Sequence, residues 1–433
     1  MRGLAVLAAV ALVAGGVAAA CGVTPATPTS STGEPTAVPP SPAAPSPVQP
    51  GPERWTTLNW TPVEEPLFEV QGTTVSGVDT DSSRIVAWGE TTVPDGSAPG
   101  GSRTIFALWT STNDGLTWRR HEVKRPTGEP FRVAYAAIAP SGYLVAGGSR
   151  GVPRREVMTS VDADRWTVVG AYPDEPQGRI RPTGDGFVTG GLRNGLPVVL
   201  VSSDGSAWEA IPVVSQPGRY SLGDVVHTAG GGLLLAGAVR GEPNSDGFLV
   251  GWNPDGSVVD LLRGNPMFVG PDRAVSFYKA VVHAGGIYVM GSVGEADPGP
   301  CAGLKGRIAA NGPIVADVCG VAEVAWASSD GVTWREVAAP RPADGTPDGA
   351  ATIFDIRAGA AGLVALVQEA PPGQAVGAGV WTSPDGVDWR RLGDGHSASD
   401  HGPGGNLVAL PGRLITFQER PDGITVWIGT PGG

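Results

Sequence analysis

The sequence predicts an all-β fold: a seven-bladed β-propeller of four-stranded antiparallel blades, with the last blade closed by an N-terminal strand. Three observations lead to this prediction. A strand–turn–strand unit that carries a tryptophan recurs along the chain. Short apolar segments repeat with a period of roughly 40–55 residues, which is the range of propeller blades. After the N-terminus, no long stretch has helical periodicity.

The recurring unit is clearest at 380–392, which reads VWTSPDGVDWRRL. Trp381 belongs to a residue type that is enriched in strands. Asp385 and Gly386 favour a tight turn, because an Asp side chain can accept backbone N–H groups and glycine tolerates positive φ. Trp389 then supplies a large apolar surface as the next strand begins. Further copies stand at 109–120, 159–168, 201–210 and 326–337.

The number of blades comes from the apolar second strands, which align better than any other part of the repeat. A turn, usually with glycine, precedes each of these strands. The turns are not phosphate-binding loops, because no helix follows them. The segments are 84–90, 142–148, 186–192, 232–238, 286–292, 362–368 and 413–419.

The seventh unit lacks a fourth strand, because the chain ends soon after ITVWIGT at 424–430. The missing strand has a counterpart at the other end of the repeat region. Residues 53–58, ERWTTL, are similar to the fourth strands DWRRL and TWREV. We therefore expect residues 54–60 to pair with 424–430, which would close the ring of blades and remove a weak seam.

Two blades depart from the pattern. In the fourth, residues 251–256 keep the turn, but Val258 and Val259 stand where the tryptophan is expected. The fifth carries an insertion at about 294–323 that is bracketed by Cys301 and Cys319. In an exported protein these two cysteines predict a disulfide, and the alternative is two free thiols.

The N-terminus predicts export. Residues 1–20 combine Arg2 with a short apolar run of small residues, as in a secretory signal peptide. The run ends in small residues followed directly by Cys21, which resembles the lipobox of bacterial lipoproteins, although Ala18 stands where leucine is more usual. The resemblance implies cleavage before Cys21 and lipidation of its thiol and new amine. The alternative is an ordinary signal peptide with an incidental cysteine.

Residues 21–52 form the expected tether, because Pro, Thr, Ser, Ala and Gly leave almost no apolar side chain to bury. The propeller then occupies 53–433. The expected location is the outer face of the cytoplasmic membrane, with the lipid anchor as the membrane partner. The net charge of -12 and the pI of about 4.9 argue against a nucleic-acid partner. We expect a monomer without a cofactor.

The repeated turn resembles the Asp-box, or bacterial neuraminidase repeat, whose pattern is Ser-x-Asp-x-Gly-x-Thr-Trp. Ser111, Asn113, Gly115 and Trp118 keep its full spacing, with Asn in place of Asp, and the other copies are one residue shorter. The resemblance implies a propeller whose boxes lie on peripheral turns and stabilise the fold. The residues with this structural role in the other copies are Asp162, Trp166, Asp204, Trp208, Asp330, Trp334, Asp385 and Trp389.

The resemblance also raises sialidase chemistry, which in this superfamily uses three arginines, a Tyr nucleophile with a Glu partner, and an Asp acid/base. Its Arg-Ile-Pro signature is expected near the first blade. The nearest match, at 179–182, reads RIRP, is broken by Arg181 and lies in the third blade. We therefore do not expect sialidase activity. Hydrolysis by two acids across the channel needs no such signature and stays open.

The candidate channel residues lie on the first strands, which run along the axis of a propeller. Aligned on the following turn, His227, His283 and Arg357 form one column in three successive blades, with Asp224, Lys279 and Asp355 nearby. These six residues could form a polar arc that faces a ligand. The alternative is that they only meet water at the strand ends. A metal site is not expected, because no third ligand accompanies the two histidines at zinc-type spacing.

The sequence thus favours a surface-anchored, non-catalytic binding or scaffold module at the bacterial cell envelope, with a glycan or protein as ligand. The alternative is a sialidase-like glycoside hydrolase that uses acids in the central channel. A third possibility is a purely structural role in the envelope. The lining of the channel would discriminate between the first two.

Overall fold

The computed structural model describes residues 55–432, except for gaps at 82, 99, 140, 149–155, 172–174, 177–179, 184–185, 215–217, 229–231, 241–244, 254, 263–267, 269–272, 296–321, 341–349, 360, 371–376, 396–397, 400–401 and 404–405. The predicted signal peptide, the tether, Cys21 and the Cys301–Cys319 pair lie outside the described residues. In the described part of the chain, no helix is long and apolar enough to cross a membrane.

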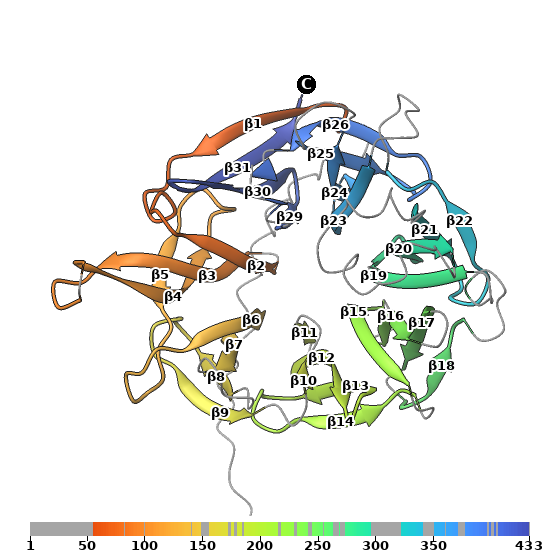
Figure 1. The fold of residues 1–433 in the computed structure, drawn as a ribbon, viewed down its shortest axis with the longest axis horizontal. Coiled ribbons are helices and arrows are strands. Elements are labelled where there is room, and N and C mark those ends of the chain that lie inside the picture. Colours follow the sequence, from red (N-terminus) through yellow and green to blue (C-terminus); the bar gives the residue numbers. More distant parts are fainter. Residues whose placement is uncertain are drawn as a thin grey trace, which may run out of the picture. The chain divides into compact units, whose positions relative to one another are not determined.

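The described residues form a seven-bladed β-propeller, and this part of the sequence prediction is confirmed. Figure 1 shows the sheets arranged radially, with the first strands around the centre and the fourth strands at the rim. The first blade consists of β2 (Thr74–Thr80), β3 (Ile85–Pro94), β4 (Ser102–Ser111) and β5 (Arg119–Glu122). The second consists of β6 (Arg132–Ala139), β7 (Gly142–Gly148), β8 (Glu156–Ser160) and β9 (Thr167–Ala171).

The third blade consists of β10 (Glu175–Pro176), β11 (Arg181–Thr183), β12 (Gly186–Arg193), β13 (Leu196–Ser202) and β14 (Glu209–Pro212). The fourth consists of β15 (Arg219–His227), β16 (Leu233–Arg240), β17 (Ser245–Trp252) and β18 (Val258–Asp260). The third blade differs from the predicted four strands, because two short strands, β10 and β11, both pair with β12 in place of one continuous first strand.

The fifth blade consists of β19 (Arg273–His283), β20 (Gly286–Glu295), β21 (Ala322–Ser328) and β22 (Arg335–Val337). The sixth consists of β23 (Ala350–Gly359), β24 (Gly362–Ala370), β25 (Gly377–Ser383) and β26 (Arg390–Gly395). A separate two-stranded pair follows, β27 (Ala398–Ser399) with β28 (Gly402–Pro403). The seventh blade consists of β29 (Leu407–Leu410), β30 (Arg413–Arg420), β31 (Gly423–Pro431) and β1 (Leu58–Val63).

The seventh blade contains strands from both ends of the described chain. β1 pairs antiparallel with β31, so that Leu58 lies opposite Pro431 and Val63 opposite Val426. The strand therefore begins four residues later than the predicted 54. Trp55 precedes the strand and is fully buried between the sixth and seventh blades.

The hydrophobic core is divided into seams, by which we mean the apolar contacts between neighbouring blades. In six seams a tryptophan that precedes a fourth strand joins the cluster, because the large indole surface fills the space between two twisted sheets. These residues are Trp118, Trp166, Trp208, Trp334, Trp389 and Trp55. The seam between the third and fourth blades has no such tryptophan among its described residues.

The fourth blade lacks this tryptophan because Val258 takes its position. Trp326 faces Glu336 in the fifth blade, and Val250 faces Asp260 in the fourth, so both hairpins have the same length. Counted from these pairs, Val258 corresponds to Trp334. The sequence expectation that valine stands in place of the tryptophan is therefore confirmed at Val258, whose side chain is exposed.

Candidate functional site

The candidate site is built on the first strands, and these strands share one irregularity. The register of the first strand shifts by one residue in five blades, as at a β-bulge, which bends the strand and redirects its side chains. The shifts lie between Val75 and Gly77, Val133 and Tyr135, Leu222 and Asp224, Phe277 and Lys279, and Ile353 and Asp355. Three of the predicted channel residues, Asp224, Lys279 and Asp355, are therefore the first residues after a bulge.

Asp355 is the centre of a buried polar cluster. It is 1% exposed, and its Oδ2 lies 2.9 Å from Nη2 of Arg357. Its Oδ1 lies 3.8 Å from Nζ of Lys279, which belongs to the preceding blade. The carboxylate also accepts the backbone N–H of Ile356 at 3.1 Å and that of Leu407, in the next blade, at 3.4 Å. One carboxylate thus contacts three blades.

Other polar side chains on the first strands also link one blade to the next. Asp224, 7% exposed, accepts the backbone N–H of Ala280 in the fifth blade at 3.4 Å. Asp79 accepts that of Ile138 in the second blade at 3.2 Å. Asn406 donates from Nδ2 to the carbonyl oxygen of Val75 at 2.8 Å and so connects the seventh blade to the first. Buried carboxylates and amides of this kind stabilise the fold only when their hydrogen bonds are satisfied.

A cavity of about 280 Å³ lies among these strands. Five first strands supply its walls, namely β2, β15, β19, β23 and β29, and His227 and Arg357 line it as predicted from the sequence. Arg357 also donates from Nε to the carbonyl oxygen of Leu407 at 3.3 Å. The lining residues are Val78, Asp79, Thr80, Val226, His227, Ala280, Val281, Val282, Ile356, Arg357, Ala358, Leu407, Val408 and Ala409.

The six predicted channel residues therefore divide into two groups. His227 and Arg357 face the cavity, whereas Asp224, Lys279 and Asp355 lie behind it in contacts between blades. His283 ends β19, is half-buried and is not part of this lining. Among the described residues, no group of three or more His, Cys, Asp or Glu side chains is placed to hold a metal ion.

Sequence reasoning missed Asp79, which lines the same cavity from the first blade. The alignment that found His227 and Arg357 was anchored on the turn after the first strand, and it covered three blades only. Asp79 lies between the bulge and the turn, where residues can still be aligned by counting, so the alignment missed it only because the first blade was not included. A search of every first strand for acidic residues within apolar runs would have included Asp79.

The repeated outer turns have a different geometry and lie at the rim. In the fifth blade, Asp330 Oδ1 accepts the backbone N–H groups of Val332 at 2.8 Å and Thr333 at 2.7 Å. Trp334 Nε1 donates to the carbonyl oxygen of Gly331 at 3.2 Å. The backbone N–H groups of Thr333 and Val332 lower the pKa of Asp330 well below its ordinary value of 3.8, since they favour the carboxylate.

Most other copies use the same bonds. Asp162, Asp204 and Asp385 each accept two backbone N–H groups of their own turn, and in the first blade Asn113 accepts that of Thr117 at 3.0 Å. Trp118 and Trp208 donate from Nε1 to the carbonyl oxygens of Gly115 and Gly205, and Ser111 Oγ accepts the N–H of Gly115. No turn of this kind faces the central cavity.

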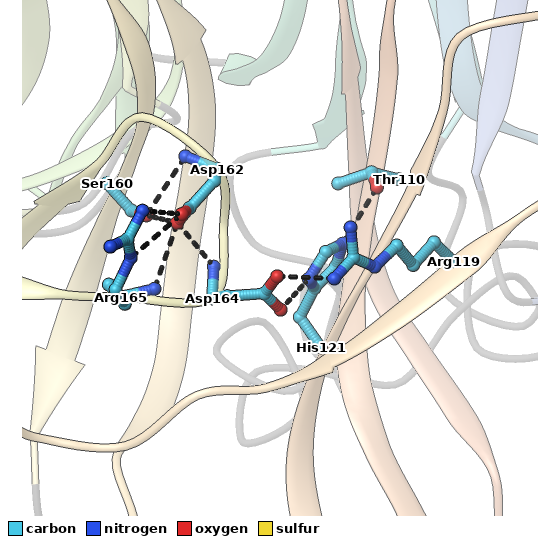
Figure 2. A network of polar contacts seen from close by, with 7 residues as sticks. All are labelled: Thr110, Arg119, His121, Ser160, Asp162, Asp164 and Arg165. Atoms are coloured by element: carbon cyan, nitrogen blue, oxygen red, sulfur yellow. Dashed lines mark hydrogen bonds and ion pairs between the residues drawn. The ribbon is translucent and has the colours of Figure 1, made fainter.

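Figure 2 shows a network of polar contacts that joins the first blade to one of these turns. His121 is 3% exposed, and its Nε2 lies 2.9 Å from Thr110 Oγ1. Its Nδ1 lies 2.6 Å from Oδ1 of Asp164 in the second blade, and Arg119 donates to Oδ2 of the same carboxylate at 2.5 Å. The order hydroxyl, imidazole, carboxylate occurs in nucleophilic enzymes. Here Thr110 and His121 are both buried, so the hydroxyl is not open to a substrate. The network instead connects two blades.

No family model matches the chain, and no curated protein matches it in sequence. Solved structures do match. The sialidase of Trypanosoma rangeli is 12% identical with a TM-score of 0.40, over 86% of this chain and 59% of that one. The β-propeller domain of Cps50 (Swd1) from Myceliophteria thermophila is 8% identical with a TM-score of 0.45, over 85% and 99%.

A protein from Lactobacillus plantarum is 9% identical with a TM-score of 0.45, over 79% of this chain and 91% of that one. At such identities a similarity concerns the fold alone. The class that the strands and seams define is an all-β, seven-bladed propeller with a cavity at its centre that is lined by apolar and a few polar side chains.

Proposed function

We propose that this protein is a rigid, non-catalytic binding module of the bacterial cell envelope, and that a small polar ligand binds in the central cavity. The observation that carries the proposal is the use of the buried acids. Asp224 and Asp355 hold neighbouring blades together through backbone N–H groups and cations. An acid engaged in this way is poorly placed to exchange protons with a substrate, as hydrolysis by a pair of carboxyl groups requires.

The cavity instead offers hydrogen-bond donors that can bind an acceptor atom of a ligand. Arg357 is 18% exposed at its side chain and uses Nε and Nη2 in its contacts with Leu407 and Asp355. A guanidinium carries five N–H donors, so Arg357 can make these contacts and also donate to a carboxylate, carbonyl or hydroxyl oxygen of a ligand. His227 lines the same cavity. The predicted ligand is therefore a glycan or peptide end that carries such an oxygen.

The test is a screen of the full-length chain against arrays of glycans and peptides, with hydrolysis of the glycans followed in parallel. Ala358→Trp should weaken binding of any hit at least about tenfold, because Ala358 is an exposed residue of the cavity wall and the indole would obstruct it. Ala98→Trp, in the loop between β3 and β4 of the first blade, is the control. Equal binding by both variants would place the ligand elsewhere, and turnover of a glycan would favour the glycoside hydrolase.

The proposed location depends on residues 1–52. Cys21→Ala should release the protein into the culture medium, since the lipid would no longer be attached. Retention of that variant in the membrane fraction would contradict the anchor and leave the binding proposal unaffected.

A further inference from the structure

A second cavity lies in the seam between the third and fourth blades, away from the repeated turns of the other seams. Its volume is about 630 Å³, within the range of about 300–1,000 Å³ that is common for ligand pockets. The third blade contributes Val188 and Trp208, and the fourth contributes Leu233 and Trp252. We call it the seam pocket.

The seam pocket exists because Val258 stands where the other blades have a tryptophan. In other blades the turn glycine also lies against an apolar side chain of the preceding blade. A side chain built at Gly115 would collide with Ile415, one at Gly205 with Leu144, and one at Gly386 with Tyr288. At Gly256, the turn glycine of the fourth blade, nothing lies within 4 Å of a side chain built in the same way. The outer turn of the fourth blade therefore leaves the third blade uncovered at this point.

The missing group is an indole. Six seams receive a tryptophan from the turn or segment that precedes a fourth strand, as Trp334 does between the fourth and fifth blades. The seam pocket has none, although its walls belong to the same second and third strands that hold the indole elsewhere. An aromatic ring from a ligand can take that place, since it would pack against Leu233 and the rings of Trp208 and Trp252.

The polar part of the lining indicates what the ring should carry. Glu209 is the only acidic side chain among the described lining residues. His227, which also lines the central cavity, adds an imidazole, and Ser202, Ser203 and Thr183 add hydroxyl groups. A basic group on the ligand could pair with Glu209 and also contact a tryptophan face. We propose that the seam pocket binds a small molecule that combines an aromatic ring of indole size with a basic substituent.

Three probes with the same ring test the proposal: tryptamine, indole and indole-3-acetate, titrated calorimetrically into the full-length protein. We expect tryptamine to bind best and indole-3-acetate worst, because their charges attract and repel Glu209. Glu209→Gln should reduce the preference for tryptamine over indole at least about threefold. Glu336→Gln is the matched control, an exposed glutamate on the fourth strand of the fifth blade, and should leave the preference unchanged.

One substitution decides whether the absent indole is the reason for binding. Val258→Trp places an indole at the position that corresponds to Trp334 of the fifth blade. The indole should fill the pocket, weaken tryptamine binding at least about tenfold and raise the thermal midpoint. Val258→Ala is the control and should still bind.

Several outcomes would overturn the proposal. One is the absence of saturable binding of all three probes to the folded protein. Another is equal binding by Val258→Trp and Val258→Ala. If Val258→Trp does not fold, Trp252→Ala takes its place, and unchanged tryptamine affinity in that variant would contradict the site. Ala358→Trp, which obstructs the central cavity only, should leave tryptamine binding intact, so failure of this site and failure of the proposed function are distinguishable.

Discussion

At the scale of single residues, Asp330 and Asn113 perform the same task with different chemistry. Each accepts backbone N–H groups two to four residues ahead and thereby fixes an outer turn. The carboxylate of Asp330 gains from its charge, which is why its pKa lies below 3.8, whereas the amide of Asn113 makes the bond without a titrating group. The backbone N–H and side chain of Arg165 lower the pKa of Asp162 in the same way.

Asp330→Asn should therefore keep the turn but change the response to acid. A lowered pKa in the folded state contributes stability that is present above the ordinary value of 3.8 and is lost as the pH falls toward the lowered value. We expect the thermal midpoint of the native protein to fall between about pH 5 and pH 2, and the Asp330→Asn variant to lose less over that range.

The measurement is the thermal midpoint by circular dichroism as a function of pH. Asp422→Asn serves as the control, because Asp422 is exposed between β30 and β31 and accepts no hydrogen bond among the described residues. An acid response in Asp330→Asn as steep as that of the native protein would show that the turn carboxylate does not contribute.

At the scale of elements, the bulged first strands are what the sequence could not supply. The apolar second strands were predicted almost residue for residue: 142–148 coincides with β7, and 84–90 lies at the start of β3. Their glycine turns and unbroken apolar runs are visible by inspection. A bulge adds one residue without changing composition, so the shift between Ile353 and Asp355 leaves no mark in the pattern.

The same limit explains the candidate site. His227 and Arg357 were found because they lie between the bulge and the turn, where counting still works. The partners of Asp355 were not, because Lys279 and Leu407 come from neighbouring blades and are brought together only by the ring. The fourth blade was recognised as degenerate because valine stands where the tryptophan is expected, and the strand pairing places Val258 at that position.

The structural role of the bulged strands can be tested at Asp355. Asp355→Ala should lower the free energy of unfolding by about 3–5 kcal/mol, because removing one partner of a buried pair leaves the other charge uncompensated. Arg357 and Lys279 would both lose a carboxylate partner, and the N–H of Leu407 would lose its acceptor. Denaturant unfolding measures the change. Asp422→Ala should cost within about 0.5 kcal/mol, and an equally small cost at Asp355 would contradict the assignment.

At the scale of the whole propeller, the position of β1 determines how the ring is held. β2 and β29 belong to adjacent blades whose apolar faces form one cluster, with Ile85 and Ile415 among its members. A ring of packed sheets has one place where the chain's two ends must meet. Here the chain passes from β1 in the seventh blade to β2 in the first, so the pairing of β1 with β31 links the two blades that meet there. Only short blade edges are left exposed.

A covalent link between β1 and β31 tests this arrangement. Asn59 and Thr430 are both exposed and lie directly opposite each other, so Asn59→Cys with Thr430→Cys should form a disulfide on oxidation. The bridge would join residues near the two ends of the propeller, and the chain-entropy model puts the upper limit of its effect near 6 kcal/mol for so long a loop. The thermal midpoint should rise in oxidised but not in reduced protein, with the bridge identified by peptide mapping. The control pair, Asn59→Cys with Thr425→Cys, has cysteines on the same two strands that are not opposed. If the control pair forms its bridge as readily as the opposed pair, or if the opposed pair stays reduced, then β1 is not held on β31 and the ring must be closed by packing alone.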